Sequence, residues 1–289
     1  MMWPKMIAMT AAVLGALGVA PAVAQGPGAP SGAVPQPAAG VSAEAAARAE
    51  LAPTGTLRAA INFGNPVLAQ QDPAGGTPRG VSASLAREIA RRLGVPITYV
   101  TFDAAGRVTD ANRENPGHVW DVAFLAIDPG RAEGIAFTAP YVVIEGVYAV
   151  RADSPVRANK EVDRAGQRIA VGRGSVYDLF LTREIRAATL VRSATSAGAI
   201  EDFARDPTLG VVAGVGQPVR AFAAERPGYR VLPGHFMVIE QAVATPRGRE
   251  AGLAFLREVV EDAKASGLVT RALAESGQRD AEQAPPAAR

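Results

Sequence analysis

The chain of 289 residues contains no cysteine and only two histidines, His118 and His235. Without cysteine there can be no disulfide, no thiolate nucleophile and no metal site with cysteine ligands. Two histidines offer little for a metal site or a Ser-His-Asp triad, and the sequence pairs neither with a general base. We therefore predict no catalytic residue, no metal site and no cofactor.

The chain also lacks a large excess of one charge, because its 30 Lys and Arg residues nearly balance its 28 Asp and Glu residues and the net charge is +2. The arginines are scattered, which argues against a nucleic-acid partner. Apolar residues make up 48% of the chain, enough for a substantial core. After the first two dozen residues, no apolar run is long enough to cross a bilayer.

The first 24 residues are typical of a cleavable signal peptide. Lys5 is followed by an apolar region at 7–20 and by Ala22-Val23-Ala24, so the mature chain is expected to begin at Gln25. The alternative is a membrane anchor, but the apolar region is short for a span of about 20 residues. Since a lipid anchor would need a cysteine, we predict a protein exported to the periplasm without lipid.

Both ends of the mature chain have low-complexity composition. Residues 25–53 are rich in Pro, Ala and Gly and predict a tether, within which Ser42 caps a short helix at 42–51. Residues 278–289 are charged, contain proline and lack any period, so a disordered tail is predicted.

Between these ends, strand and helix patterns alternate, which favours an α/β fold with mostly parallel strands. A helix capped by Ser82 repeats Leu85, Ile89 and Leu93 and ends at Gly94. The other helices are predicted from Ser175, at 199–204, at 218–224 and up to Gly267. Strands are predicted at 57–63, 97–102, 119–126, 142–150, 168–171, 190–191, 209–213, 231–232 and 236–244.

These units form two groups of about a hundred residues. Extended segments near 142–148 and 238–244 are expected to cross between them. The prediction is a discontinuous lobe 1 (54–143 plus 243–277) and a lobe 2 (144–242), joined by two hinge crossings. A cleft between such lobes is a usual place for a small-molecule site.

The first candidate site lies in the stretch 119–141, which reads V-W-D-V-A-F-L-A-I-D-P-G-R-A-E-G-I-A-F-T-A-P-Y. Asp128 is a good N-cap and Pro129 suits the first helical position, so Arg131 falls in the first turn of a short helix. A guanidinium there, past the end of a strand, could bind a carboxylate through two hydrogen bonds. The alternative is a surface arginine paired with Glu133 or Asp128.

The second candidate site is Gly172-Arg173-Gly174-Ser175-Val176-Tyr177-Asp178. Ser175 and Asp178 fit a capping box, and the two glycines allow a close approach of the backbone. This helix start could hold the other end of an anion. On local pattern alone, an ordinary helix start explains it as well, and no G-K-[ST] follows to make it a phosphate loop.

Further candidates lie at strand ends and crossings. Asn62, Phe63 and Asn65 follow the first strand and could wall a polar ligand, although core packing also explains Phe63. Glu145 and Glu240 lie on the crossings, where a carboxylate could receive an ammonium group or pair across the hinge.

Several stretches, in order and spacing, resemble the family 3 extracellular solute-binding proteins, the polar amino-acid receptors of ABC importers. In the first lobe these are G-T-L-R-A-A-I-N-F (55–63), R-G-V-S-A-S-L-A-R-E-I-A-R-R-L-G (79–94) and W-D-V-A-F-L-A-I-D-P-G-R-A-E-G-I-A-F-T-A-P-Y (120–141). In the second lobe and at the end they are G-Q-R-I-A-V-G-R-G-S-V-Y (166–177) and A-K-A-S-G (263–267). The resemblance covers residues 54–277.

The resemblance implies a two-lobe periplasmic binding protein fold of type II that closes on a small carboxylate. It also implies a monomer that delivers its ligand to an inner-membrane ABC permease. Arg131 falls where the family has its carboxylate-binding arginine, and Ser175 matches the second-lobe loop that helps hold that carboxylate.

The sequence departs from the family at three places. Leu125-Ala126-Ile127 replaces a turn with Ser or Thr ahead of the arginine, and Gly80-Val81-Ser82 replaces G-[FY]-D. The acid that receives the α-ammonium is missing from residues 213–217. Either Glu145, Glu240 or Asp128 substitutes for it, or the ligand has no α-amino group, because an unpaired buried ammonium is costly.

A receptor for a small carboxylate is therefore the main hypothesis. An enzyme resembling cyclohexadienyl dehydratase is the alternative, with Glu145 or Glu240 as its acid or base. A third hypothesis is an exported sensor or accessory subunit that signals its bound state to a partner protein.

Overall fold

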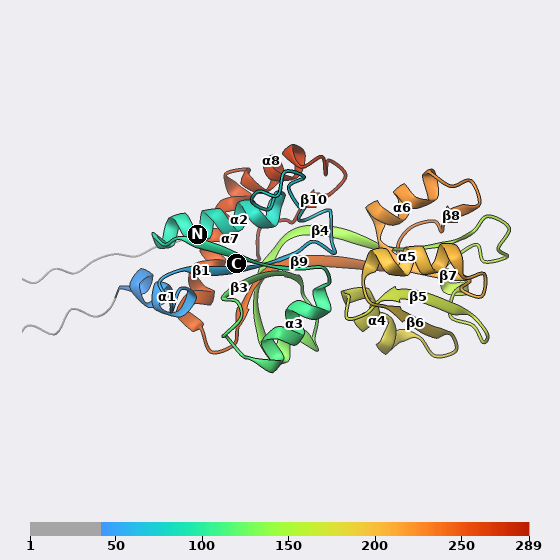
Figure 1. Cartoon of the computed structure of the whole chain (residues 1–289), viewed down its shortest axis with the longest axis horizontal. Helices are drawn as coiled ribbons and strands as arrows, with labels where there is room; N and C mark the ends of the chain where they lie inside the picture. Colours follow the sequence, from blue (N-terminus) through green and yellow to red (C-terminus); the bar gives the residue numbers. More distant parts are fainter. Residues whose placement is uncertain (1–41, 289) are drawn as a thin grey trace, which may run out of the picture. The chain divides into compact units, whose positions relative to one another are not determined.

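The predicted alternation of strands and helices is present in residues 42–288, the part of the chain that the computed structural model describes (Figure 1). The predicted signal peptide (1–24) and residues 25–41 of the predicted tether lie outside the described residues. In chain order the elements are α1 (Ala43–Leu51), β1 (Leu57–Asn62), α2 (Val81–Leu93), β2 (Ile97–Phe102), α3 (Ala105–Glu114), β3 (Val122–Ala126), η1 (Arg131–Glu133), β4 (Ile135–Arg151), η2 (Asn159–Glu161), β5 (Arg168–Gly172), α4 (Val176–Glu184), β6 (Thr189–Ser193), α5 (Ser196–Arg205), β7 (Val211–Val215), α6 (Gly216–Ala224), β8 (Tyr229–Val231), β9 (Met237–Pro246), α7 (Glu250–Ala265), α8 (Leu268–Glu275) and β10 (Glu282–Gln283).

The strands form two parallel groups joined by two antiparallel strands. The hydrogen-bonded order is β2-β1-β3-β9-β4-β7-β5-β6, with β8 and β10 each paired to β4. Strand β1 is parallel to β2 and β3, and β5 is parallel to β6 and β7. All antiparallel pairings among the described strands involve β4 or β9. The expectation of mostly parallel strands holds within each group.

Strands β4 and β9 belong to both groups, which we call the first lobe (β1–β3) and the second lobe (β5–β7). They pair through Ile144 and Ile239, while β9 continues along β3 and β4 continues along β7. Figure 1 shows the two strands running from β3 toward β7. The lobe boundaries predicted at residues 143 and 242 fall inside these strands.

Local sequence explains where the first helices begin and end. Ser42 caps α1 as predicted, with its hydroxyl accepting a hydrogen bond from the Ala45 N–H. Helix α2 ends at Gly94 in the left-handed conformation, also as predicted. The start of α2 differs from the prediction, because the helix begins at Val81 and its N-cap residue is Gly80, with φ 97°. Glycine suits this position, since a Cβ there would lie 2.5 Å from the Leu68 carbonyl. Ser82 is therefore inside the helix and does not cap it.

Two of the α-helices in residues 42–288, α3 and α8, were not predicted by the residue pattern. Helix α3 buries only Gly106, Val108 and Asn112, so its apolar period is too weak to read from the sequence. It is nevertheless held in place, because the indole N–H of buried Trp120 donates to the Val108 carbonyl. Helix α8 follows α7 after Gly267, which has φ 74° and was read as the end of helical structure.

Each lobe has an apolar core between its strands and helices. In the second lobe, Phe203, Phe222 and Tyr229 form an aromatic cluster with ring centroids 4.8–6.2 Å apart. In the first lobe, Trp120 and Ile135 pack under α3, and Leu85 and Ile89 pack from α2 against β1. No helix in residues 42–288 is long and apolar enough to cross a membrane.

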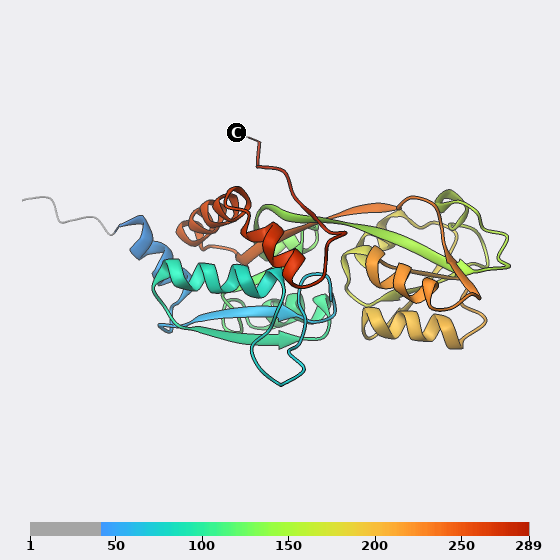
Figure 2. The ribbon, with the colours of Figure 1, turned by 90° about the horizontal axis from the view of Figure 1, so that it is seen from above.

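The predicted disordered tail at 278–289 is wrong for much of its length. Strand β10 pairs with β4 at Val142 and Val143, and Ala281 and Ala284 are buried. The buried Lys264 donates to the carbonyls of Pro140 and Pro285. Figure 2 shows this last segment, in red, leaving α8 and passing over β4. Only tertiary contacts order it, which is why its composition was misleading.

We predict that deleting residues 279–289 lowers the free energy of unfolding by ~1–3 kcal/mol, because Lys264 and the edge of β4 lose their partners. Urea denaturation measures this. The exposed Arg279 is the matched control, and Arg279→Ala should change the value by about 0.5 kcal/mol or less. An unchanged midpoint for the deletion would show that the tail contacts carry no stability.

Candidate functional site

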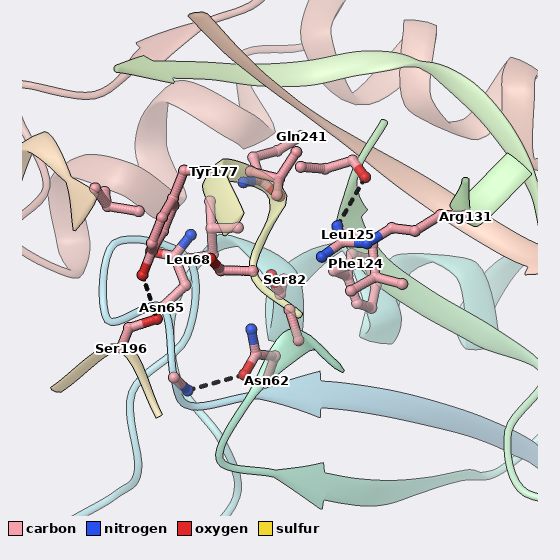
Figure 3. A pocket seen from close by; sticks show the side chains of 16 residues that line it. Asn62, Asn65, Leu68, Ser82, Phe124, Leu125, Arg131, Tyr177, Ser196 and Gln241 are labelled. Atoms are coloured by element: carbon pink, nitrogen blue, oxygen red, sulfur yellow. Dashed lines mark hydrogen bonds between the residues drawn. The ribbon is translucent and has the colours of Figure 1, made fainter. Parts of the chain in front are cut away.

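A small cavity lies where the two lobes meet, at the carboxyl ends of their parallel strands, where open α/β sheets usually bind ligands. Its volume is about 40 Å³, whereas a cavity that holds one water has ~10–15 Å³ by the same measure. Figure 3 shows its side chains. They are Asn62, Gly64, Asn65, Leu68, Ser82, Ala105, Phe124, Leu125, Ala126, Arg131, Ser175, Val176, Tyr177, Ser196, Val215 and Gln241.

Arg131 is the only charged residue among those that line the cavity. Its guanidinium donates to the carbonyl of Ala126 in the first lobe and to that of Gly174 in the second, both at 2.9 Å. Its Nε is buried and has no hydrogen-bond partner. Burial lowers the pKa of Arg131 to about 10, while Asp128 acts in the opposite direction. The side chain is thus a cation at neutral pH.

Asp128 positions Arg131, and it does not line the cavity. Its Oδ1 accepts from the backbone N–H groups of Gly130 and Arg131, as the predicted cap does. The turn that follows is the 3-10 helix η1, which begins at Arg131. The Oδ2 atom of Asp128 forms an ion pair of 2.8 Å with Arg183 of the second lobe. Asp128 as a direct ligand contact is therefore not supported.

The second-lobe loop has one half of the predicted capping box, because the N–H of Ser175 itself donates to the Gly172 carbonyl. The Ser175 hydroxyl accepts from the Asp178 N–H at 3.1 Å, and the Asp178 carboxylate accepts from the Gly174 N–H at 2.9 Å. Asp178 is buried, pairs with Arg192 and does not line the cavity, so it does not oppose an anion there. Gly174 contributes its carbonyl to Arg131 and lies just outside the lining.

Hydroxyl and amide groups surround the rest of the cavity. The Tyr177 hydroxyl donates to Ser196 at 2.7 Å, and burial raises the pKa of Tyr177. The Asn62 and Asn65 side-chain oxygens accept from the backbone N–H groups of Gly64 and Val67. Both asparagines line the cavity as predicted. Phe63 does not, because it packs against the core.

Neither of the two crossing carboxylates lines the cavity, and Glu145 forms an ion pair, which was the alternative expected for it. Glu145 does not line the cavity and pairs with Arg220 and His235 on the surface, and Arg220 lowers the pKa of its carboxyl. Glu240 is exposed, and its neighbour Gln241 lines the cavity. Successive side chains of a strand point to opposite faces, so a shift of one residue decides which side chain faces the cavity.

Four residues that line the cavity were not among the predicted site residues. They are the polar Ser82, Ser196 and Gln241 and the apolar Val215. Ser82 was read as a cap, but it is buried and its hydroxyl lies 3.3 Å from that of Tyr141. Glu240 and Gln241 are the two polar residues inside the predicted apolar strand 236–244, and because neighbours on a strand face opposite sides, one of them had to face inward. No cluster of His, Asp or Glu within 42–288 could hold a metal ion.

Solved structures that resemble this chain are two-lobe periplasmic binding proteins. A mutant of ArgBP from T. maritima is 23% identical with a TM-score of 0.67, and the match covers 80% of this chain and 99% of that one. A solute receptor for L-cysteine from Neisseria gonorrhoeae is 20% identical, with a TM-score of 0.67 over 79% and 92%. The ancestral amino-acid-binding protein AncCDT-1, a precursor of cyclohexadienyl dehydratase, is 18% identical, with a TM-score of 0.65 over 79% and 98%.

Likeness at these identities shows the fold, which is the predicted α/β two-lobe binding-protein fold. The sequence model of the bacterial extracellular solute-binding proteins, family 3, matches residues 57–275. The chain belongs to this family. No curated protein matches the chain in sequence.

We predict that Asp128→Ala lowers the free energy of unfolding by ~1–3 kcal/mol, because the turn loses its cap and a buried acceptor. Chemical denaturation without ligand checks this. Glu240→Ala removes a carboxylate from an exposed position on the crossing and should cost about 0.5 kcal/mol or less. Equal effects of the two substitutions would refute the structural role given to Asp128.

Proposed function

We propose that this protein is a periplasmic receptor that captures a small carboxylate by closure of its lobes and delivers it to an ABC importer. The buried Arg131 is the observation that carries this proposal. Removing a cation from water costs several kcal/mol, and two carbonyl contacts offset only part of that cost. A carboxylate in the cavity would supply the missing charge and a two-pronged contact.

Closure is supported by contacts that join the lobes around the cavity. Arg131 reaches the Gly174 carbonyl, and Asp128 pairs with Arg183. Gly106 of α3 and Gly174 approach so closely that a Cβ added at Gly174 would lie 2.7 Å from the Gly106 Cα. Because these contacts lie beside the cavity, we propose that the lobes separate to admit a ligand of several heavy atoms.

Export to the periplasm is supported by the family and by the first 24 residues. The family consists of extracellular solute-binding proteins, and the segment has the charged start, apolar middle and small-residue end of a signal peptide. We propose a soluble monomer in the periplasm whose partner is an inner-membrane permease.

An enzyme on the same fold is the less favoured alternative. The acid or base it needs was expected at Glu145 or Glu240, and neither lines the cavity. Among residues 42–288, the lining contains no Asp, Glu, His or Lys. Binding without turnover is the function that this set of side chains supports.

We predict that Arg131→Ala weakens the binding of any carboxylate ligand by about tenfold or more, because the charged contact contributes ~1.5–3 kcal/mol. Isothermal titration calorimetry measures it. Arg131→Lys keeps the charge but loses the planar fork, so it should bind with intermediate affinity.

Arg173 provides the matched control for loss of one positive charge. It is exposed, lies on the same second-lobe loop as Gly174 and does not line the cavity. Arg173→Ala should leave the affinity within about twofold, because exposed charges act weakly through water. If Arg131→Ala and Arg173→Ala behave alike, Arg131 is not the carboxylate site.

We predict that Gly106→Val holds the lobes apart, because a Cβ at Gly106 would already lie 3.0 Å from the Arg173 carbonyl. Small-angle X-ray scattering should give a larger radius of gyration at saturating ligand, and affinity should fall. Ala111→Val adds two of the same three carbon atoms at a half-buried position on the same helix and should change neither value. A Gly106→Val protein that closes normally would contradict closure at this contact.

A further inference from the structure

The cavity contains many hydrogen-bond donors, and its acceptors are neutral amide and hydroxyl oxygens with no carboxylate, which restricts the ligand beyond its carboxylate. The Asn62 and Asn65 oxygens already accept from backbone N–H groups. A backbone N–H can only donate, so these bonds fix the amide orientation and leave both NH₂ groups available to a ligand. Figure 3 shows Asn62 and Asn65 on the side of the cavity away from Arg131.

Two hydroxyl groups of the cavity, those of Ser175 and Ser196, also accept a hydrogen bond from the protein and keep a hydrogen to donate. The Ser175 oxygen accepts from the Asp178 N–H, so its hydrogen is free to donate. The Ser196 oxygen accepts from the Tyr177 hydroxyl and can pass its own hydrogen on. Each of these two oxygens has already used one of its two acceptor positions, whereas its hydroxyl hydrogen is free to donate to a ligand.

An ammonium group would find little compensation in this cavity. It carries three N–H donors and needs acceptors, above all a carboxylate. The lining offers the Gln241 amide, but no acid. The nearby carboxylates of Asp128 and Asp178 are bonded to Arg183 and Arg192 and do not line the cavity. A buried ammonium without an acidic partner is strongly disfavoured.

We infer that the ligand is a short carboxylate with an oxygen substituent on the carbon next to the carboxylate, that is, a 2-oxo or 2-hydroxy acid, and that the corresponding amino acid is excluded. This inference rests on the proposed function, with Arg131 and Ser175 at the carboxylate. The NH₂ groups of Asn62 and Asn65 then bind the second oxygen. The small volume and the apolar Leu68, Phe124 and Leu125 limit the carbon skeleton.

Val215 offers a direct way to change this selectivity. It lines the cavity at the end of β7 and is the N-cap residue of α6, where no side chain caps the helix. Aspartate is similar in size to valine and is favoured at an N-cap. Val215→Asp therefore adds a carboxylate to the cavity at a position that tolerates it, and Val215→Asn adds a polar group of the same shape without charge.

The test measures thermal shift and calorimetry for four three-carbon acids: pyruvate, lactate, alanine and propionate. They share the skeleton and differ only in the group at the second carbon. We expect pyruvate or lactate to bind at least about tenfold more tightly than alanine, and propionate to be weaker by about tenfold. Val215→Asp should reverse the order of lactate and alanine, whereas Val215→Asn should not.

Two results would overturn the ligand class. One is alanine binding as tightly as pyruvate and lactate to the natural protein. The other is binding of none of the four acids, when a longer amino acid or dicarboxylate in the same panel binds through Arg131. If no carboxylate of any kind raises the melting temperature, the proposed function itself fails. The comparison on the natural protein does not depend on whether the Val215 variants fold.

Discussion

The buried guanidinium of Arg131 is the interaction on which the arrangement of this protein depends. It joins a carbonyl of each lobe, and in the described part of the chain no carboxylate bonds to it. A cation in this position is costly unless a partner arrives. The turn at Asp128 and the close approach of the second-lobe loop at Gly174 both serve to hold it there. In the proposed function, the cost of burying this cation without a charged partner is what favours binding of an anion.

The sheet topology places this local feature between two groups of strands. Each parallel group of strands ends at the cavity, and the long strands β4 and β9 connect the two groups. Among the described strands, only these two cross between the groups, and an apolar cluster that includes Ile89 and Ile169 continues from one lobe into the other. The ordered tail pairs with β4 at Val142 and Val143, so the C-terminal segment lies beside the crossing.

Several of the site residues could be predicted from the sequence because their chemistry is local. Arg131 follows a good cap, and Ser175 begins a helix after a strand, so both fall at strand ends that meet in an α/β fold. Asn62 likewise lies at a strand end, since it is the last residue of β1. Glu145 and Glu240 could not be placed this way, since the face of a crossing strand depends on its register with its neighbours.

The sequence by itself determined the alternation of strands and helices, the family and the arginine at the end of β3, because each of these depends on short-range pattern. Tertiary structure alone decided that Gln241, Val215 and Ser196 complete the cavity and that no acid does. It also ordered the tail, which no local pattern could show. The physical reason is the same in each case: burial and hydrogen-bond partners come from residues far apart in the chain, and these determine what a side chain can bind.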